Sequence, residues 1–222
     1  MIRLVKINKI YNHTQAGQMS VLKDISFTVK ENEFTLLNGP SGSGKSTVLS
    51  IIGGLIKPTS GKVYVDGKSI AKLPDKFSAL IRREKIGFIF QKFNLIHDLN
   101  VVDNVTIPLI PGKLHKAEIE KRAESILKDL SILDKKYALV RNLSGGEQQR
   151  VSIARSLINQ PKIILADEPT ANLDKKLSHA FIKIMKELKE KGKTILLASH
   201  DPLFSNLNSI DNIINIHLGE IK

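Results

Sequence analysis

The stretch Gly39-Pro40-Ser41-Gly42-Ser43-Gly44-Lys45-Ser46-Thr47 decides how the rest of this sequence is interpreted. It follows an apolar run at residues 34–37 and leads into another at residues 47–52, so a strand, a glycine-rich turn and a helix are expected in that order. Small residues let backbone N–H groups turn inward on phosphates, and the following helix adds the positive end of its dipole. The stretch therefore predicts a phosphate-binding loop, with Lys45 against the β- and γ-phosphates and the Ser46 hydroxyl on Mg²⁺.

A pair of acids ends another apolar run, Ile163-Ile164-Leu165-Ala166-Asp167-Glu168. This pattern indicates a buried strand that ends at a site. A phosphate loop needs a carboxylate to complete the magnesium shell, so Asp167 is expected to hold Mg²⁺, directly or through water. Glu168 lies one residue further on and is expected to polarise the attacking water. A helix N-cap acid would explain one carboxylate at a strand end, but not its combination with a phosphate loop.

A second helix start that suits an anion is predicted at Leu143-Ser144-Gly145-Gly146-Glu147, which leads into the amphipathic residues 148–158. The same pattern is also that of a simple capping box, with Ser144 as the N-cap and Glu147 three residues later. Both interpretations stay open at this point. If the functional one holds, the chain has either a two-sided site or a site that another subunit completes.

Composition limits the kind of protein this can be. The chain has 222 residues, of which 41% are hydrophobic and none is Cys. It is long enough to bury a full core as one large domain, or as one domain with an inserted subdomain, without disulfides. The lack of Cys excludes thiolate zinc sites, iron–sulfur clusters and thiol nucleophiles. The six His are scattered, and no two have the spacing that places both on one helix face.

Charge and hydropathy point to an intracellular protein with no membrane span. The 34 Lys and Arg outnumber the 22 Asp and Glu, which gives a formal charge of +12 that would suit nucleic acid or an anionic membrane. These basic residues are interleaved with acids and lack an accompanying stacking or zinc-finger motif, so no nucleic-acid partner is expected. No apolar run approaches the roughly 18 to 20 residues that cross a bilayer, and the N-terminus lacks a signal-peptide apolar region.

The order of the apolar patterns predicts an α/β fold. Short runs of strand length lie at residues 3–7, 25–29, 34–37 and 62–65. Helical spacing follows at residues 101–109 and 119–130. Helix and strand patterns then alternate at residues 148–158, 162–166, 176–189 and 194–198. Such alternation favours a parallel sheet covered by helices, with a core of residues 1–90 and 160–222 and a helical insert at about residues 91–159.

Taken together, these motifs resemble those of the ATP-binding cassette subunits of ABC transporters, over essentially the whole chain. Residues 143–147 are similar to the signature motif of that family, and Gln91 stands where the family has its Q-loop. Asp174 falls in a segment similar to the D-loop, and His200 resembles the switch histidine. Tyr11 stands where the family places an aromatic residue that stacks on adenine.

The resemblance implies a single ABC ATPase domain over residues 1–222. Its fold would be the P-loop NTPase type, with a mostly parallel core sheet, an N-terminal antiparallel β subdomain and a helical subdomain insert. The substrate would be ATP with Mg²⁺, and the catalytic residues would be Glu168, His200 and Gln91. The metal would be held by Ser46, Gln91 and Asp167, while His200 would contact the γ-phosphate.

The resemblance also implies partners. ATP binding would join two copies head to tail, with each ATP between the phosphate loop of one copy and residues 143–147 of the other, and Asp174 would cross the interface. This arrangement explains why one chain has two anion-binding helix starts. Residues 92–100 would form a groove for a coupling helix of a separate integral membrane permease subunit. The chain would then lie at the cytoplasmic face of the cell membrane.

Within the family, Arg82-Arg83 and residues 86–96 look most like the branch of macrolide exporters, lipoprotein-release ATPases and antimicrobial-peptide efflux pumps. The expected function is therefore the ATPase motor of an efflux or extraction transporter. One alternative is a mechanical role on a membrane partner in cell-wall or division control. Another is a soluble nucleic-acid or translation ATPase, which the single cassette and the missing coiled-coil insertion disfavour. The transported molecule is not readable from a subunit that contacts coupling helices rather than cargo.

Overall fold

The computed structural model describes residues 1–11, 17–112 and 114–222, which form two sheets and the helices around them. A four-stranded antiparallel sheet has the order β2-β1-β4-β5, and a six-stranded sheet has the order β10-β9-β3-β8-β7-β6. The strands of the first sheet are β1 (Ile2–Tyr11), β2 (Met19–Val29), β4 (Ser60–Val65) and β5 (Lys68–Ser69). Those of the second are β3 (Phe34–Asn38), β6 (Ile86–Ile89), β7 (Ile163–Asp167), β8 (Thr194–Ser199), β9 (Asn212–His217) and β10 (Glu220–Ile221).

The antiparallel sheet begins with a strand whose side-chain alternation changes along its length. Ile2 and Leu4 are buried, but the next buried residue is Ile7 rather than residue 6. Lys6 has a φ of 49°, and the register with β2 shifts between Leu4 and Ile7. A bulge of this kind moves the alternation by one residue, so Ile7 returns to the core face. β1 is therefore longer than the expected strand at residues 3–7.

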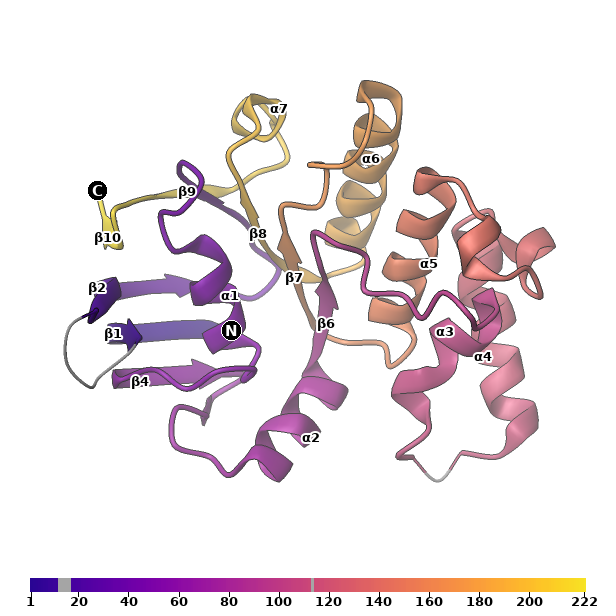
Figure 1. Ribbon diagram of the computed structural model, residues 1–222, viewed down its shortest axis with the longest axis horizontal. Helices are drawn as coiled ribbons and strands as arrows, with labels where there is room; N and C mark the ends of the chain where they lie inside the picture. Colours follow the sequence, from indigo (N-terminus) through magenta and orange to yellow (C-terminus); the bar gives the residue numbers. More distant parts are fainter. Residues whose placement is uncertain (12–16, 113) are drawn as a thin grey trace.

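The six-stranded sheet is buried on both faces, as an almost entirely parallel sheet must be. On β7, Ile163 and Leu165 pack in one apolar cluster with α1 (Lys45–Ile52) and the antiparallel sheet. Ile164 and Ala166 face the opposite cluster, which includes residues of α5 (Gly145–Leu157) and α6 (Lys175–Glu190). Figure 1 shows α1 between the two sheets and α5 and α6 beyond the parallel strands.

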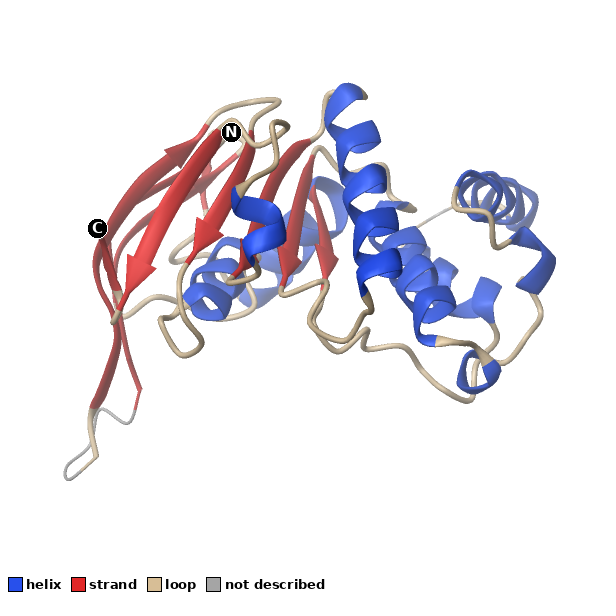
Figure 2. Cartoon of the chain, turned by 90° about the horizontal axis from the view of Figure 1, so that it is seen from above, coloured by secondary structure: helices blue, strands red, loops and turns tan. Residues whose placement is uncertain are grey.

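The remaining helices lie mainly between β6 and β7 in the chain. They are α3 (Val101–Thr106), η1 (Ile107–Leu109), α4 (Lys116–Asp129), η2 (Leu133–Lys135) and η3 (Val140–Asn142). Figure 2 shows the strands at one end of the molecule and only helices and loops at the other. Two further helices, α2 (Asp75–Lys85) and α7 (Pro202–Ser205), precede β6 and follow β8. Within the described residues, no helix is long and apolar enough to cross a membrane.

The expected fold class is confirmed, since both sheets and the covering helices are present and the solved structures of known cassettes have the same fold. Two helix boundaries were predicted incorrectly. The helix expected at residues 101–109 ends at Thr106 and continues as a 3₁₀ turn that contains Pro108, a residue with no N–H to donate to the helix. The helix expected at 148–158 starts three residues earlier, at Gly145, because Ser144 caps it there.

Candidate functional site

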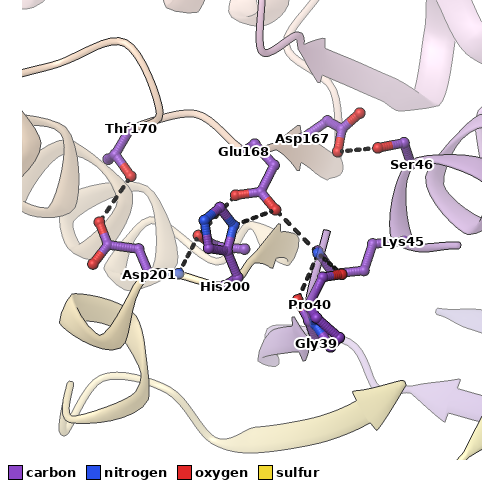
Figure 3. Close-up of polar contacts among 10 residues, drawn as sticks. Gly39, Pro40, Lys45, Ser46, Asp167, Glu168, Thr170, His200 and Asp201 are labelled. Atoms are coloured by element: carbon purple, nitrogen blue, oxygen red, sulfur yellow. Dashed lines mark hydrogen bonds and ion pairs between the residues drawn. The ribbon is translucent and has the colours of Figure 1, made fainter. Parts of the chain in front are cut away.

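Three neighbouring parallel strands, β3, β8 and β7, end at the same edge of the sheet, and their following residues form the candidate site (Figure 3). The phosphate loop follows β3, Asp167 and Glu168 stand at the end of β7, and His200 follows β8. In an open α/β sheet the carboxyl ends of the strands are where ligands bind. The topology thus explains how residues far apart in sequence come together.

Two glycines of the phosphate loop lie where neighbouring atoms leave no room for a side chain. Gly44 caps α1 with a φ of 102°, and a Cβ there would lie 2.6 Å from Leu22 Cδ2. A Cβ on Gly39 would overlap the backbone oxygen of Ile216 on β9. Glycine is therefore required for packing at Gly39 and for both packing and backbone conformation at Gly44.

Lys45 is buried beneath this loop, with 5% of its surface exposed. Its ammonium group donates to the backbone oxygens of Gly39 and Pro40 at 2.7 and 3.0 Å and pairs with Glu168 Oε1 at 3.1 Å. A cation this buried needs such partners. All three of them are oxygens, so the phosphate oxygens of a nucleotide are chemically equivalent replacements for them.

Glu168 is the centre of the cluster and is 9% exposed. Besides Lys45, its carboxylate contacts His200 Nδ1 at 3.0 Å and accepts a hydrogen bond from Ser199 Oγ at 3.2 Å. Its backbone φ is 42°, a conformation that costs energy in a residue with a side chain. A bond from Glu168 N to Ala198 O at 2.9 Å helps to hold it there. Holding the Glu168 backbone in this conformation therefore lowers the stability of the folded chain.

Asp167 and Ser46 form the oxygen pair that could hold Mg²⁺. Ser46 Oγ donates to Asp167 Oδ1 at 2.9 Å. Burial raises the pKa of Asp167, and the negative charge of Glu168 raises it further, against the opposing effects of Ser46 and Lys45. One hydroxyl and one carboxylate are a suitable donor set for a cation that arrives with substrate phosphates. Within the described residues, no group of three His, Asp or Glu forms a stand-alone metal site.

The phosphate loop also contains a buried hydroxyl that the rest of the described chain does not satisfy. Ser43 is 2% exposed, and its Oγ has no hydrogen-bond partner among the described residues. Buried polar groups are normally paired, and an unpaired one in a binding loop is a candidate contact for a ligand. Together with Lys45, this hydroxyl makes the loop suitable for an oxyanion.

The residues of the signature-like motif lie elsewhere. Figure 1 shows α1 and α5 on opposite sides of β7 and β6. Ser144 Oγ accepts a bond from Glu147 N, and Glu147 Oε2 accepts from Ser144 N and Oγ, so the capping box is present. The Ser144 bonds lower the pKa of Glu147. Within the described part of the chain, no hydrogen bond or ion pair joins residues 143–147 to the phosphate loop.

The other expected site residues have local partners. Gln91 is exposed, and its backbone oxygen accepts a bond from Asn172 Nδ2 at 3.1 Å. Asp174 caps α6 through a bond from Leu177 N at 2.8 Å. Tyr11 is 39% exposed at the end of β1, with Lys9 Nζ 4.8 Å from its ring centre. None of these contacts reaches the Lys45–Glu168 cluster.

Sequence reasoning missed three polar residues beside the cluster. Ser199 donates to Glu168. Thr170 Oγ1 donates to Asp201 Oδ2 at 3.3 Å (Figure 3). Asp201 also caps α7. Both Ser199 and Asp201 flank His200, so the polar sequence at this strand end was the signal available. Which of these side chains would face Glu168 depends on the pairing of β7 with β8, which the sequence does not state.

Comparisons with known proteins identify the family. A family model described as ABC transporter matches residues 22–171. The ABC transporter ATP-binding protein MJ0796 of Methanocaldococcus jannaschii is 44% identical over 100% of this chain and 95% of its own. A dimeric post-hydrolysis structure of MJ0796 bound to ADP and Pi has a TM-score of 0.91 at 42% identity, over 100% of this chain and 97% of that one.

Two relatives have names that state a transport process. The lipoprotein-releasing system ATP-binding protein LolD of Hyphomonas neptunium is 38% identical over 100% of this chain and 96% of LolD. The macrolide export ATP-binding/permease protein MacB of Bartonella henselae is 44% identical over 97% of this chain, which corresponds to 33% of MacB. The family match, these identities and the site geometry agree. The chain belongs to the ABC transporter family and is an ATP-binding protein that hydrolyses ATP.

Proposed function

We propose that this chain powers an efflux or extraction transporter, by binding ATP between two of its copies and hydrolysing it in contact with a separate membrane subunit. The observation that carries the proposal is the separation of two features. Lys45, Ser46, Asp167, Glu168 and His200 meet at one sheet edge, whereas residues 143–147 start a helix on the other side of β7 and β6. A second copy can bring those residues to the phosphate loop.

Within one copy, the residues divide the chemical work. Lys45 exchanges its carbonyl partners for the β- and γ-phosphates, as a charged donor under a phosphate loop does. Glu168 accepts a proton from the attacking water, and His200 holds that carboxylate on one side and meets the γ-phosphate on the other. Ser46 and Asp167 would hold Mg²⁺, which would neutralise charge on the phosphates.

The second copy contributes the start of α5. Its backbone N–H groups and dipole favour a negative group, and the exposed Gly145 leaves room for close approach. The dimeric structures solved for the relative MJ0796 support this arrangement. Gln91 and Asp174 have exposed side-chain positions in the single copy, which suits roles that begin when ATP and the second copy arrive.

A groove of about 660 Å³ is the proposed docking site for the membrane subunit. It runs between α2, β6 and η1, and exposes the apolar Phe77 and Leu80 beside the basic Lys76 and Arg83. Residues 92–100, which were expected from the sequence to form the docking groove, do not line it; part of this segment lines a smaller hollow of about 330 Å³. Arg155 lines the groove and donates to the backbone oxygens of Phe93 and Asn94 at 2.6 and 2.5 Å. Movement in the groove can thus reach the segment that follows Gln91.

The names of two relatives support the proposed direction of transport and the proposed location. LolD releases lipoproteins and MacB exports macrolides by name, and in MacB the ATP-binding part and the permease are one protein. The name of LolD, of which this chain covers 96%, is that of an ATP-binding protein alone, and this supports a permease on a separate polypeptide. The chain would then act at the cytoplasmic face of the cell membrane.

The test is affinity capture from detergent-solubilised native membranes, with Glu168→Gln protein and ATP to hold the dimer together. Recovery of an integral membrane protein is expected, and Phe77→Asp in the groove should abolish it without loss of ATP binding. Lys45→Ala, which lacks the cation under the phosphate loop and should bind ATP more weakly, is the control, used at an ATP concentration that saturates only the chain with Lys45. Recovery of RNA or ribosomes with no membrane protein would contradict the proposal.

A further inference from the structure

We propose that Gln149 is a positioning residue for hydrolysis, because its buried amide ties α5 to the turn that carries Glu168. The inference rests on the proposed role of Glu168 as the group that activates water. Gln149 itself does not touch nucleotide in this account. It acts through the backbone of residue 169.

The contact is a buried hydrogen bond between two parts of the chain 20 residues apart. Gln149 is 3% exposed, and its Nε2 donates to the backbone oxygen of Pro169 at 3.3 Å. The other end of the same amide, Oε1, has no hydrogen-bond partner among the described residues. A half-satisfied buried amide costs stability relative to an apolar side chain of the same length. Packing alone would therefore favour leucine or methionine at this position.

The turn that Gln149 holds is one that needs support. Glu168, directly before Pro169, has the strained φ of 42°. The Glu168 carboxylate also contacts Lys45 of α1, Ser199 and His200. The remaining bonds of the turn are from Glu168 N to Ala198 O, from Ala171 N to Glu168 O, and from Thr170 to Asp201 at the start of α7. Among the bonds described for residues 168–171, the bond from Gln149 to Pro169 O is the one that links this turn to α5. The position of the Glu168 carboxylate thus depends on where α5 lies.

The same helix begins with the capping box at residues 144–147, which the proposed function brings to the nucleotide of the other copy. Gln149 lies one turn further along α5. A shift of the helix start is therefore transmitted to the carboxylate of its own site through a single side chain. Gln149 would make hydrolysis at the site of one copy depend on how residues 143–147 of that copy contact the nucleotide of the other copy.

The first test is Gln149→Met, which keeps the length of the side chain and removes the donor. We expect kcat for ATP hydrolysis to fall by about tenfold with the KM for ATP unchanged, because small displacements of a reacting group cost up to about a hundredfold. Gln149→Glu, which places a negative charge against Pro169 O, should cost more. The control is Asn159→Leu, which removes the same type of bond, from Asn159 Nδ2 to Pro108 O at 3.3 Å, away from residues 168–170.

The second test separates positioning from general stability and from failure of the underlying role. In a double-mutant cycle, Gln149→Met should have little further effect on kcat once Glu168→Gln is present. An equal loss of kcat in both backgrounds would overturn the positioning role, as would an unchanged kcat or one that falls only as far as Asn159→Leu lowers it. If Glu168→Gln itself leaves kcat unchanged, the proposed role of Glu168 is what fails, and the proposal for Gln149 falls with it.

Discussion

The Lys45–Glu168 cluster and the Ser144–Glu147 capping box both hold a carboxylate beside an anion-binding helix start, yet they use it in opposite ways. In the cluster, the buried cation of Lys45 pairs with Glu168, whose backbone is strained. The negative charge of Glu168 also acts on the neighbouring Asp167. In the capping box, the carboxylate satisfies the backbone of its own helix. The cluster lowers the stability of the chain and holds the groups proposed to bind phosphate and activate water. The capping box raises the stability of α5.

The pKa directions express this difference. Burial raises the pKa of Asp167, while hydrogen bonds from Ser144 lower that of Glu147. A raised carboxyl pKa means that ionisation opposes folding, and a lowered one means that ionisation favours it. In a single copy, the Lys45–Glu168 cluster therefore includes a carboxylate whose ionisation opposes folding, whereas the polar groups of the Ser144–Glu147 capping box are already paired with one another. This contrast is what we expect if residues 143–147 complete the site of another copy, as proposed above.

The largest expected effect is that of Glu168→Gln, which leaves the cluster in place without its base. ATP binding should persist, and steady-state hydrolysis should slow by roughly 10² to 10⁴, as for loss of a general base. Turnover is measured under saturating ATP and binding by titration. Unchanged hydrolysis would remove Glu168 from its catalytic role and leave the cluster as a binding site only.

Next in size is Lys45→Ala, which removes the buried cation. ATP affinity should fall roughly 10- to 100-fold, the value of a charge-assisted hydrogen bond to phosphate. Isothermal titration measures the change, with Lys57→Ala as the control because Lys57 forms an exposed ion pair with Asp75. Normal ATP affinity in the Lys45 variant would show that residues 39–47 do not bind phosphates.

A smaller effect tests the capping box. Ser144→Ala should destabilise the free chain by about 1 kcal/mol, because the cap of α5 is lost. That corresponds to a fall in Tm of about 2–4 °C for a chain of this size. Ser144→Thr keeps the hydroxyl and should recover most of the Tm. If Ser144→Ala leaves Tm unchanged, the box contributes nothing to stability and the contrast with the cluster is wrong.

The smallest effect is a pair of opposite pH dependences. Asp167→Asn should stabilise the nucleotide-free chain at pH 7, because the penalty for ionising Asp167 applies above its raised pKa and disappears as pH falls to its usual 3.8. Glu147→Gln should destabilise it at pH 7, because that contribution is present above the usual 4.5 and is lost as pH falls through the lowered pKa. Urea unfolding between pH 3 and 8 measures both. Shifts of the same sign would refute the contrast.

The sequence predicted the parts of the molecule that local spacing determines. The phosphate loop follows from fixed glycine positions, and β7 and β8 follow from apolar runs. α2 was not predicted: Ser78 and Ile81 are its only buried residues, and its apolar Phe77 and Leu80 are exposed. β9 was not predicted either: its buried Ile214 and Ile216 alternate with the exposed Ile213 and Asn215, in a run with two Asn.

The site was predictable only as separate pieces. That Asp167 lies near a phosphate loop followed from chemistry, but the contacts of Glu168 with Lys45, Ser199 and His200 depend on strand order and register. The bond from Gln149 to Pro169 joins a helix to a turn and leaves no local pattern in the sequence. Tertiary placement, rather than residue type, determines these contacts.

The most direct test of the account is cross-linking between copies, since the chain contains no Cys of its own. Ser41→Cys marks the phosphate loop and Ser144→Cys marks the start of α5, each in a Glu168→Gln background. When the two variants are mixed with a short thiol cross-linker, we expect a covalent dimer that forms with ATP and Mg²⁺ and not without them. Neither variant should form it alone. Absence of the mixed product in the presence of ATP, or equal cross-linking of Ser41→Cys with itself, would contradict it.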